Sequence, residues 1–152
     1  MKVILKTVLV AGLTMLLGAG VCGCGKKDAE KTDQSKSTLD QSTPETVAKT
    51  WWQAVVDEDF KTVETVSTPA LAKELTDDIK AKMKKAFAQY KGKEIAADPA
   101  KIKESDGKKF ATVQVILAPN EQKLKNSQRV RLIFQDGKWM AASPEDLPKD
   151  LR

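Results

Sequence analysis

The sequence predicts an α+β domain in which helices come first and an antiparallel sheet follows. Between residues 43 and 91, apolar side chains recur every three or four positions, which is typical of helices packed by one face. After Gly92 the pattern changes to alternation, which is typical of strands with one buried face. Two Asp-Gly pairs, beginning at Asp106 and Asp136, favour hairpin turns. Helices followed by hairpins predict helices packed on one antiparallel sheet.

Three helical segments are expected before Gly92. The first, 44–56, begins with a Thr-Pro pair, in which threonine can cap the helix and proline suits its first position. Asp59 can cap a short second helix, 60–66. The third begins at another Thr-Pro pair and runs to residue 91, with room for a break around 76–78. Its apolar residues recur every four positions: Leu71, Leu75, Ile79, Met83 and Phe87.

The alternating runs predict the strands. Residues 93–105 fit an edge strand, because Pro99 interrupts the run. Longer strands are expected in 109–118 and 128–135, and a last one in 138–142. We expect nine residues to share one core: Val113, Val115, Val130, Leu132 and Phe134 from the strands, and Val47, Trp51, Leu75 and Ile79 from the helices. The predicted helices and strands together indicate a domain over residues 43–143 and a loosely held C-terminal tail over residues 144–152.

The amino-terminal residues predict an export signal. Lys2 and Lys6 precede an apolar run, 7–21, that ends in small residues, as in a secretory signal peptide. The run is shorter than the roughly 20 residues needed to cross a bilayer. The alternative is an uncleaved membrane-spanning helix or a core helix. Two glycines near the end of the run and the polar stretch after it favour the signal peptide.

Residues 21–24, Val-Cys-Gly-Cys, resemble the lipobox of bacterial lipoproteins. Val21, Cys22 and Gly23 occupy its aliphatic, tolerant and small positions, and Cys24 is the lipid acceptor. Cys22 fits less well, because Val21 would then stand where the family has a small residue. The resemblance implies a diacylglyceryl thioether on Cys24, cleavage of the signal peptide 1–23, and acylation of the new amino terminus by a fatty acid such as palmitate. A disulfide or a metal pair is the weaker alternative, because the chain has no histidine to complete a zinc site.

Residues 24–42 join this lipidated cysteine to the domain. They are polar and charged with a single leucine, and therefore predict a disordered tether. A flexible coil of this length spans roughly 20–25 Å. We therefore expect a domain held by covalent lipid at the extracytoplasmic face of a bacterial membrane, and an inner or an outer membrane fits equally well.

Composition excludes several functions. Without residues 1–23, the chain carries 24 basic and 21 acidic residues, scattered rather than gathered into the basic stripe of a nucleic-acid-binding protein. Its one remaining cysteine carries lipid, so no thiol or imidazole remains for catalysis or for holding a metal. We predict no cofactor, no metal and no nucleic-acid partner. An enzyme would depend on carboxylates, lysines, hydroxyls or Tyr90.

From Pro44 to Ala142 the chain resembles the nuclear-transport-factor-2-like (cystatin-like) superfamily, and within it uncharacterised bacterial lipoprotein domains. The resemblance rests on an aromatic first helix that ends in an acidic turn before Phe60, the "STPAL" start of a later helix, and the "DGKWMAA" strand. It implies a strongly curved sheet wrapped round helices, often with a conical cavity. Members with a catalytic acid and a tyrosine in that cavity are enzymes.

Four aromatic residues are candidates to line such a pocket: Trp51, Trp52, Tyr90 and Trp139. Packing in the core is the simpler interpretation of each. Tyr90 with Glu94 or Asp98 could imitate the acid–tyrosine pair of an isomerase, although nothing in the spacing requires it.

Two charged clusters have a functional and a structural interpretation. The first is a row of lysines opposite an apolar stripe, Lys80, Lys82, Lys84 and Lys85, which could dock acidic polymer or lipid or be a solvated helix face. The second is the acidic run 57–59, which lacks the spaced ligands and glycine of a calcium loop and is expected to end a helix.

Together these features predict a lipid-anchored, non-enzymatic module that binds a small molecule or an envelope protein. A small cavity enzyme of the same fold, an isomerase or hydrolase with a carboxylate base, is the alternative. A structural spacer with neither pocket nor partner is a third hypothesis.

Overall fold

The structure is a computed structural model that describes residues 39–152. The predicted signal peptide, the lipobox with Cys24 and most of the tether lie outside these residues. Within 39–152, no helix is both long and apolar enough to cross a membrane.

The helical half contains four α-helices, each begun by a side-chain cap. They are α1 (Pro44–Val56), α2 (Phe60–Thr65), α3 (Pro69–Glu74) and α4 (Asp77–Phe87), and a 3₁₀ turn, Ala88–Tyr90, follows α4. The capping residues Thr43, Asp59, Thr68 and Thr76 each accept a hydrogen bond from a backbone N–H three residues later. The predicted helix starts are therefore confirmed.

The expected break in the third helical segment is also confirmed. Leu75 ends α3 in a non-helical conformation, and the Thr76 side chain caps α4 instead of continuing the helix. Because of this break, the residues at four-residue spacing do not form one buried stripe as predicted. Ile79 is 38% exposed, which corrects its assignment to the core.

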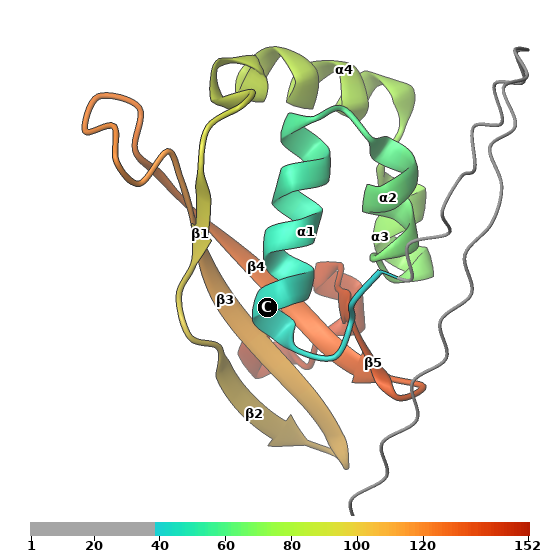
Figure 1. Ribbon diagram of the computed structural model, residues 1–152. Helices are drawn as coiled ribbons and strands as arrows, with labels where there is room; N and C mark the ends of the chain where they lie inside the picture. Colours follow the sequence, from blue (N-terminus) through green and yellow to red (C-terminus); the bar gives the residue numbers. More distant parts are fainter. Residues whose placement is uncertain (1–38) are drawn as a thin grey trace, which may run out of the picture. The chain divides into compact units, whose positions relative to one another are not determined.

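The sheet contains five antiparallel strands and is strongly curled (Figure 1). They are β1 (Ile95–Ala97), β2 (Lys101–Ser105), β3 (Lys108–Leu117), β4 (Asn126–Gln135) and β5 (Lys138–Ala141). The strand order is β1-β3-β4-β5, and β2 pairs with the half of β3 that β1 leaves free. The predicted edge strand is thus confirmed, with its interruption at Pro99 between β1 and β2. Both Asp-Gly pairs have positive φ at both residues and close the β2–β3 and β4–β5 hairpins.

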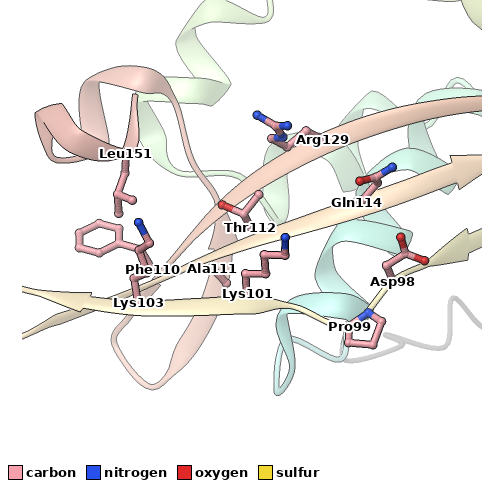
Figure 2. Close-up of a pocket in the computed structure, with 10 residues that line it drawn as sticks. All are labelled: Asp98, Pro99, Lys101, Lys103, Phe110, Ala111, Thr112, Gln114, Arg129 and Leu151. Atoms are coloured by element: carbon pink, nitrogen blue, oxygen red, sulfur yellow. The ribbon is translucent and has the colours of Figure 1, made fainter.

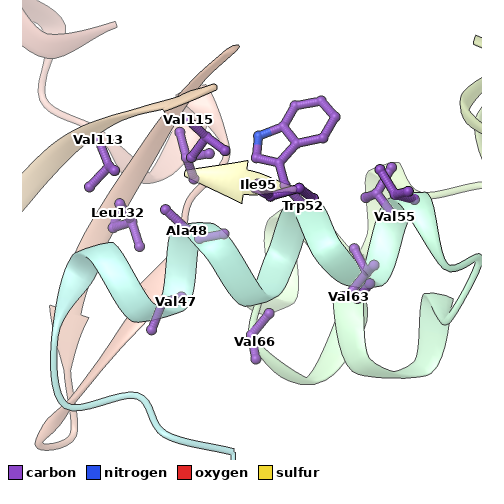
Figure 3. Packing of buried hydrophobic residues seen from close by; sticks show 14 of the residues in the cluster. Val47, Ala48, Trp52, Val55, Val63, Val66, Ile95, Val113, Val115 and Leu132 are labelled. Carbon is purple, nitrogen blue, oxygen red and sulfur yellow. The ribbon is translucent and has the colours of Figure 1, made fainter. Parts of the chain in front are cut away.

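Alternation gives the sheet two different faces. The face toward α1 carries Val113, Val115, Val130 and Leu132, which pack with Val47, Ala48 and Trp52 of the helix (Figure 3). Trp51 is half-buried and packs against the same cluster. Phe134 lies at the end of β4 and is 36% exposed, which corrects its assignment to the core. Its ring instead contacts Trp139, with 5.3 Å between the centroids.

The C-terminal segment is held more firmly than predicted. Leu147 is 3% exposed and packs with Phe110 and Ile133 on the sheet face away from α1. Asp146 accepts hydrogen bonds from the Thr68 hydroxyl (2.6 Å) and from the backbone N–H of Ser143 (3.0 Å). The expectation of a loosely held tail was therefore wrong for residues 144–147, because Leu147 covers a second small core.

The outer edge of β5 is closed by two segments from earlier in the chain. Gln41 exchanges hydrogen bonds with the backbone of Trp139 through its own carbonyl and its side-chain amide, each at 3.0 Å. Farther along the strand, the backbone of Ala141 bonds to Val66 and Thr68. The chain that enters the domain at residues 39–42 is thus fixed at the β5 edge.

Leu132 tests the assignment of the two sheet faces. Its side chain is fully buried, so Leu132→Asp places an unpaired carboxylate in the core. That substitution costs several kcal/mol against a total stability of about 5–15 kcal/mol, and we expect an unfolded domain. Arg131→Gln, its neighbour on the opposite face, should leave the fold intact. Circular dichroism and urea denaturation measure both, and equal losses would show that the register is misassigned.

Leu147 tests whether the C-terminal segment belongs to the folded unit. Leu147→Ala should reduce the free energy of unfolding by about 2–4 kcal/mol, because it removes buried methyl groups over Phe110 and Ile133. The exposed neighbour Glu145 provides the control, and Glu145→Ala should change stability by less than about 0.5 kcal/mol. A Leu147→Ala variant as stable as the control would mean that the segment does not pack in solution.

Candidate functional site

A groove of about 320 Å³ opens on the sheet face away from α1 (Figure 2). We call it the basic groove. Its lining comes from strands β2, β3 and β4, from the link between β1 and β2, and from a C-terminal 3₁₀ turn, Lys149–Leu151. Its ten lining residues are Asp98, Pro99, Lys101, Lys103, Phe110, Ala111, Thr112, Gln114, Arg129 and Leu151.

Strand register explains how distant residues meet in the basic groove. Lys101 lies opposite Thr112, and Lys103 lies opposite Phe110, across the β2–β3 pairing. On the other side of β3, Gln114 lies opposite Arg129. Because directly opposed residues in an antiparallel pair point to the same face, these side chains gather over the centre of β3. Residues separated by up to 28 positions in the sequence thus form one surface.

The basic groove carries more positive than negative charge. Lys101, Lys103 and Arg129 are cations, and Asp98 is the only carboxylate that lines the groove among the described residues. The ion pairs found within residues 39–152 involve other lysines, those at positions 80, 84, 93 and 109. The three groove cations therefore have no carboxylate within ion-pair distance in the described part of the chain.

One end of the basic groove is apolar. Phe110 is 4% exposed and belongs to the small cluster with Ile133 and Leu147, and Leu151 packs against the same cluster. Figure 2 shows the Phe110 ring beside Leu151 at this end, while Gln114 and Arg129 lie toward the other. The groove can therefore contact a charged group and an apolar group of the same molecule.

The four predicted pocket residues lie elsewhere. Trp52, Tyr90 and Trp139 are buried in the main core, and half-buried Trp51 donates a hydrogen bond from its indole nitrogen to the Ser67 hydroxyl (3.0 Å). The Trp52 indole N–H is buried without a hydrogen-bond partner among the described residues. The grooves found in residues 39–152 are lined by other side chains.

Tyr90 forms no hydrogen bond with Glu94 or Asp98 among the described residues. Glu94 accepts a hydrogen bond from the Asn120 amide (2.6 Å), and Asp98 lines the basic groove. Tyr90 instead lies 3% exposed in the core, with its ring 6.1 Å from that of Phe87. An isomerase-like acid–tyrosine pair is thus not assembled from these residues.

The α4 lysines are partly paired with acids. Lys80 contacts Glu64 (2.7 Å), which raises the pKa of Lys80, and Lys84 contacts Glu58 (3.1 Å). Lys82 and Lys85 are exposed. Half of the predicted docking row therefore contributes to helix packing rather than to a free basic surface.

The acidic run 57–59 ends α1 and begins α2, as expected. Asp57 is the residue after α1, and Asp59 caps α2. Hydrogen bonds from Thr62 to the Asp59 carboxylate lower the pKa of Asp59. Within residues 39–152, no three acidic or sulfur side chains lie close enough together to hold a metal ion.

Sequence reasoning did not identify the basic groove. The alternation places Arg129 and Arg131 opposite the core, and this was the available signal. The contributions of Lys101 and Lys103 require the β2–β3 register, and that of Leu151 requires the C-terminal segment to fold back. Neither can be inferred from local spacing.

No known family profile matches the chain, and no curated protein matches it. Among solved structures, it is similar to a Campylobacter jejuni protein that is provisionally named an NTF2-like transpeptidase. The similarity has a TM-score of 0.53 and 22% sequence identity, and it covers 67% of this chain and 99% of the other. At this identity the similarity concerns the fold alone. The helices and the curled antiparallel sheet of residues 39–152 therefore share the fold of this NTF2-like protein.

Proposed function

We propose that the protein is a lipid-anchored, non-enzymatic binding module of the bacterial cell envelope, and that the basic groove is its ligand site. The observation that carries the proposal is the groove itself. Three strands and the C-terminal turn bring together cations, hydrogen-bonding side chains and an apolar end. Such a combination of a few polar groups with apolar lining is typical of ligand sites.

The position of the groove relative to the anchor supports this role. The entering chain is fixed at the β5 edge through Gln41, whereas the groove lies toward β2, at the other side of the sheet. Three strand spacings separate the two edges, or roughly 14 Å. A domain held through its β5 edge leaves the groove open to ligand.

Composition supports binding rather than catalysis. The chain has no histidine, and the lipobox cysteine is the one that remains after cleavage. The groove offers Thr112 as a hydroxyl and Asp98 as a carboxylate, and no hydrogen bond joins the two among the described residues. Cations and amides that hold a ligand without an activated nucleophile fit recognition.

Separate substitutions of the two cysteines test the lipid anchor. Cys24→Ser should abolish lipidation and leave a precursor that is not processed before residue 24. Cys22→Ser should be processed normally, because Gly23 still provides the small residue before the acceptor. Mass spectrometry of the mature amino terminus measures both, and a lipid adduct on Cys22 would overturn the anchor assignment.

Co-purification tests the groove as a ligand site. The full lipoprotein, solubilised in detergent, should carry a small molecule that mass spectrometry detects. Thr112→Trp should abolish its capture, because an indole at the centre of β3 fills the groove and aromatic residues are tolerated in strands. Thr65→Trp, on the exposed surface of α2, is the matched control. A molecule retained equally by both variants would place the ligand elsewhere.

A further inference from the structure

We infer that the basic groove selects a small organic oxyanion, a carboxylate or phosphate joined to a compact apolar group. The inference rests on the proposed function in that it takes the groove to be the ligand site. It adds the chemical class of the ligand and the residues that recognise each part of it.

The cations define the charge of the ligand. Arg129 approaches the groove from β4, and Lys101 and Lys103 approach it from β2. With Asp98 as the opposing charge, the lining has two positive charges in excess. An arginine guanidinium matches the geometry of carboxylate and phosphate oxygens, and the lysines add charge on the opposite wall.

The floor between these walls supplies hydrogen bonds. Thr112 lines the groove between β2 and β4, where it lies opposite Lys101, and its hydroxyl has no partner among the described residues. The Gln114 amide is oriented by a hydrogen bond to the Ser127 hydroxyl. An oxyanion over β3 therefore meets a free hydroxyl between two basic walls.

The apolar end of the groove indicates the chemistry of the rest of the ligand. Phe110 and Leu151 form one end of the groove and are already supported by Ile133 and Leu147. A ring or short alkyl group placed there adds to an existing cluster and leaves its head group toward Arg129. A volume of about 320 Å³ is at the small end of ligand sites, which fits a compact molecule better than a polymer.

The positions of exposed apolar residues favour a soluble anion over a membrane surface. A membrane-docking face combines basic residues with apolar side chains that enter the bilayer. Among the described residues, the large exposed apolar side chains are Ile79, Ile102 and Phe134. Ile102 alternates with Lys101 and Lys103 and so points to the other face of β2. Phe134 lies on the α1 face of the sheet, and Ile79 lies on α4.

Asp98 gives the site its selectivity within this class. It lines the groove at Pro99, where it repels a second negative group and accepts a hydrogen bond from a hydroxyl or amine. We therefore expect the groove to prefer a monofunctional oxyanion to one with negative groups at both ends.

Calorimetric titration of the full lipoprotein in non-ionic detergent tests the inference with phenyl phosphate and benzoate, and with benzyl alcohol as the neutral analogue. Phenyl phosphate and benzoate should bind, and benzyl alcohol should bind at least about tenfold more weakly. Added salt should weaken the binding of both anions. Arg129→Gln should reduce anion affinity about tenfold or more, since a charge-assisted bidentate contact is lost. Arg129→Lys should recover part of that loss.

Two further variants separate the groove from general surface charge. Asp98→Asn should strengthen phenyl phosphate binding severalfold. Lys85→Gln removes an exposed cation on α4 and should leave binding unchanged. Equal weakening by Lys85→Gln and Arg129→Gln, or equal binding of benzyl alcohol and phenyl phosphate, would overturn the oxyanion assignment.

Other outcomes distinguish this inference from the function on which it rests. A neutral or cationic molecule captured by the wild type and lost in Thr112→Trp would keep the groove as the ligand site and overturn the oxyanion class. Vesicles of anionic phosphatidylglycerol test whether the ligand is a lipid surface. If the vesicles bind a Cys24→Ser chain more strongly than a chain with both Cys24→Ser and Arg129→Gln, while phenyl phosphate does not bind, the ligand is a lipid surface and the inference fails.

Discussion

The structure depends on the pairing of β3 along both of its edges. β1 and β2 share one edge of this strand, and β4 runs along the other. Successive residues of β3 therefore point alternately into two different environments. Val113 and Val115 are fully buried against α1, whereas Thr112 and Gln114 line the basic groove. A slip of one residue would exchange the core for the groove, so the burial of the valines also fixes the groove.

The interruption of the edge strand depends on a contact with α1. Pro99 cannot donate a ladder hydrogen bond, and β1 ends at Ala97. At the next residue, the backbone N–H of Ala100 donates to the Glu45 carboxylate in the first turn of α1 (2.7 Å). This bond satisfies an N–H that has no ladder partner, and β2 then resumes on the other half of β3. The same interruption places Asp98 and Pro99 in the groove wall, so helix packing and the groove share one structural cause.

Most of the fold followed from local chemistry in the sequence. Threonine and aspartate caps predicted the helix starts, the Asp-Gly pairs predicted two hairpins, and Pro99 predicted an interrupted edge. These signals succeed because each acts within a few residues of backbone. Ile79 and Phe134 failed for a different reason. Their spacing was correct, but burial depends on whether another element covers the position. The helix is broken at Leu75 before Ile79, and Phe134 lies near the end of β4.

The candidate site could not be predicted in the same way. Three aromatic residues had been given a functional interpretation: Trp52, Tyr90 and Trp139. They are buried in the core instead, because apolar side chains are removed from water regardless of any functional role. The groove is made of ordinary lysines, an arginine and a threonine, which carry no spacing signature. Only the register of three strands and the return of the C-terminal segment bring them together.

The basic groove gathers cations that form no ion pair among the described residues. Elsewhere in residues 39–152, some lysines form ion pairs with acids, as in the contacts of Lys80 with Glu64 and Lys93 with Glu121. In the groove, Lys101 lies opposite Thr112 and Arg129 lies opposite Gln114, so neither cation has an acid opposite it in these strand pairs. Cations gathered on one face repel each other. Because a bound anion would reduce this repulsion, anion binding should stabilise the folded domain, which links the charge of the groove to its proposed function.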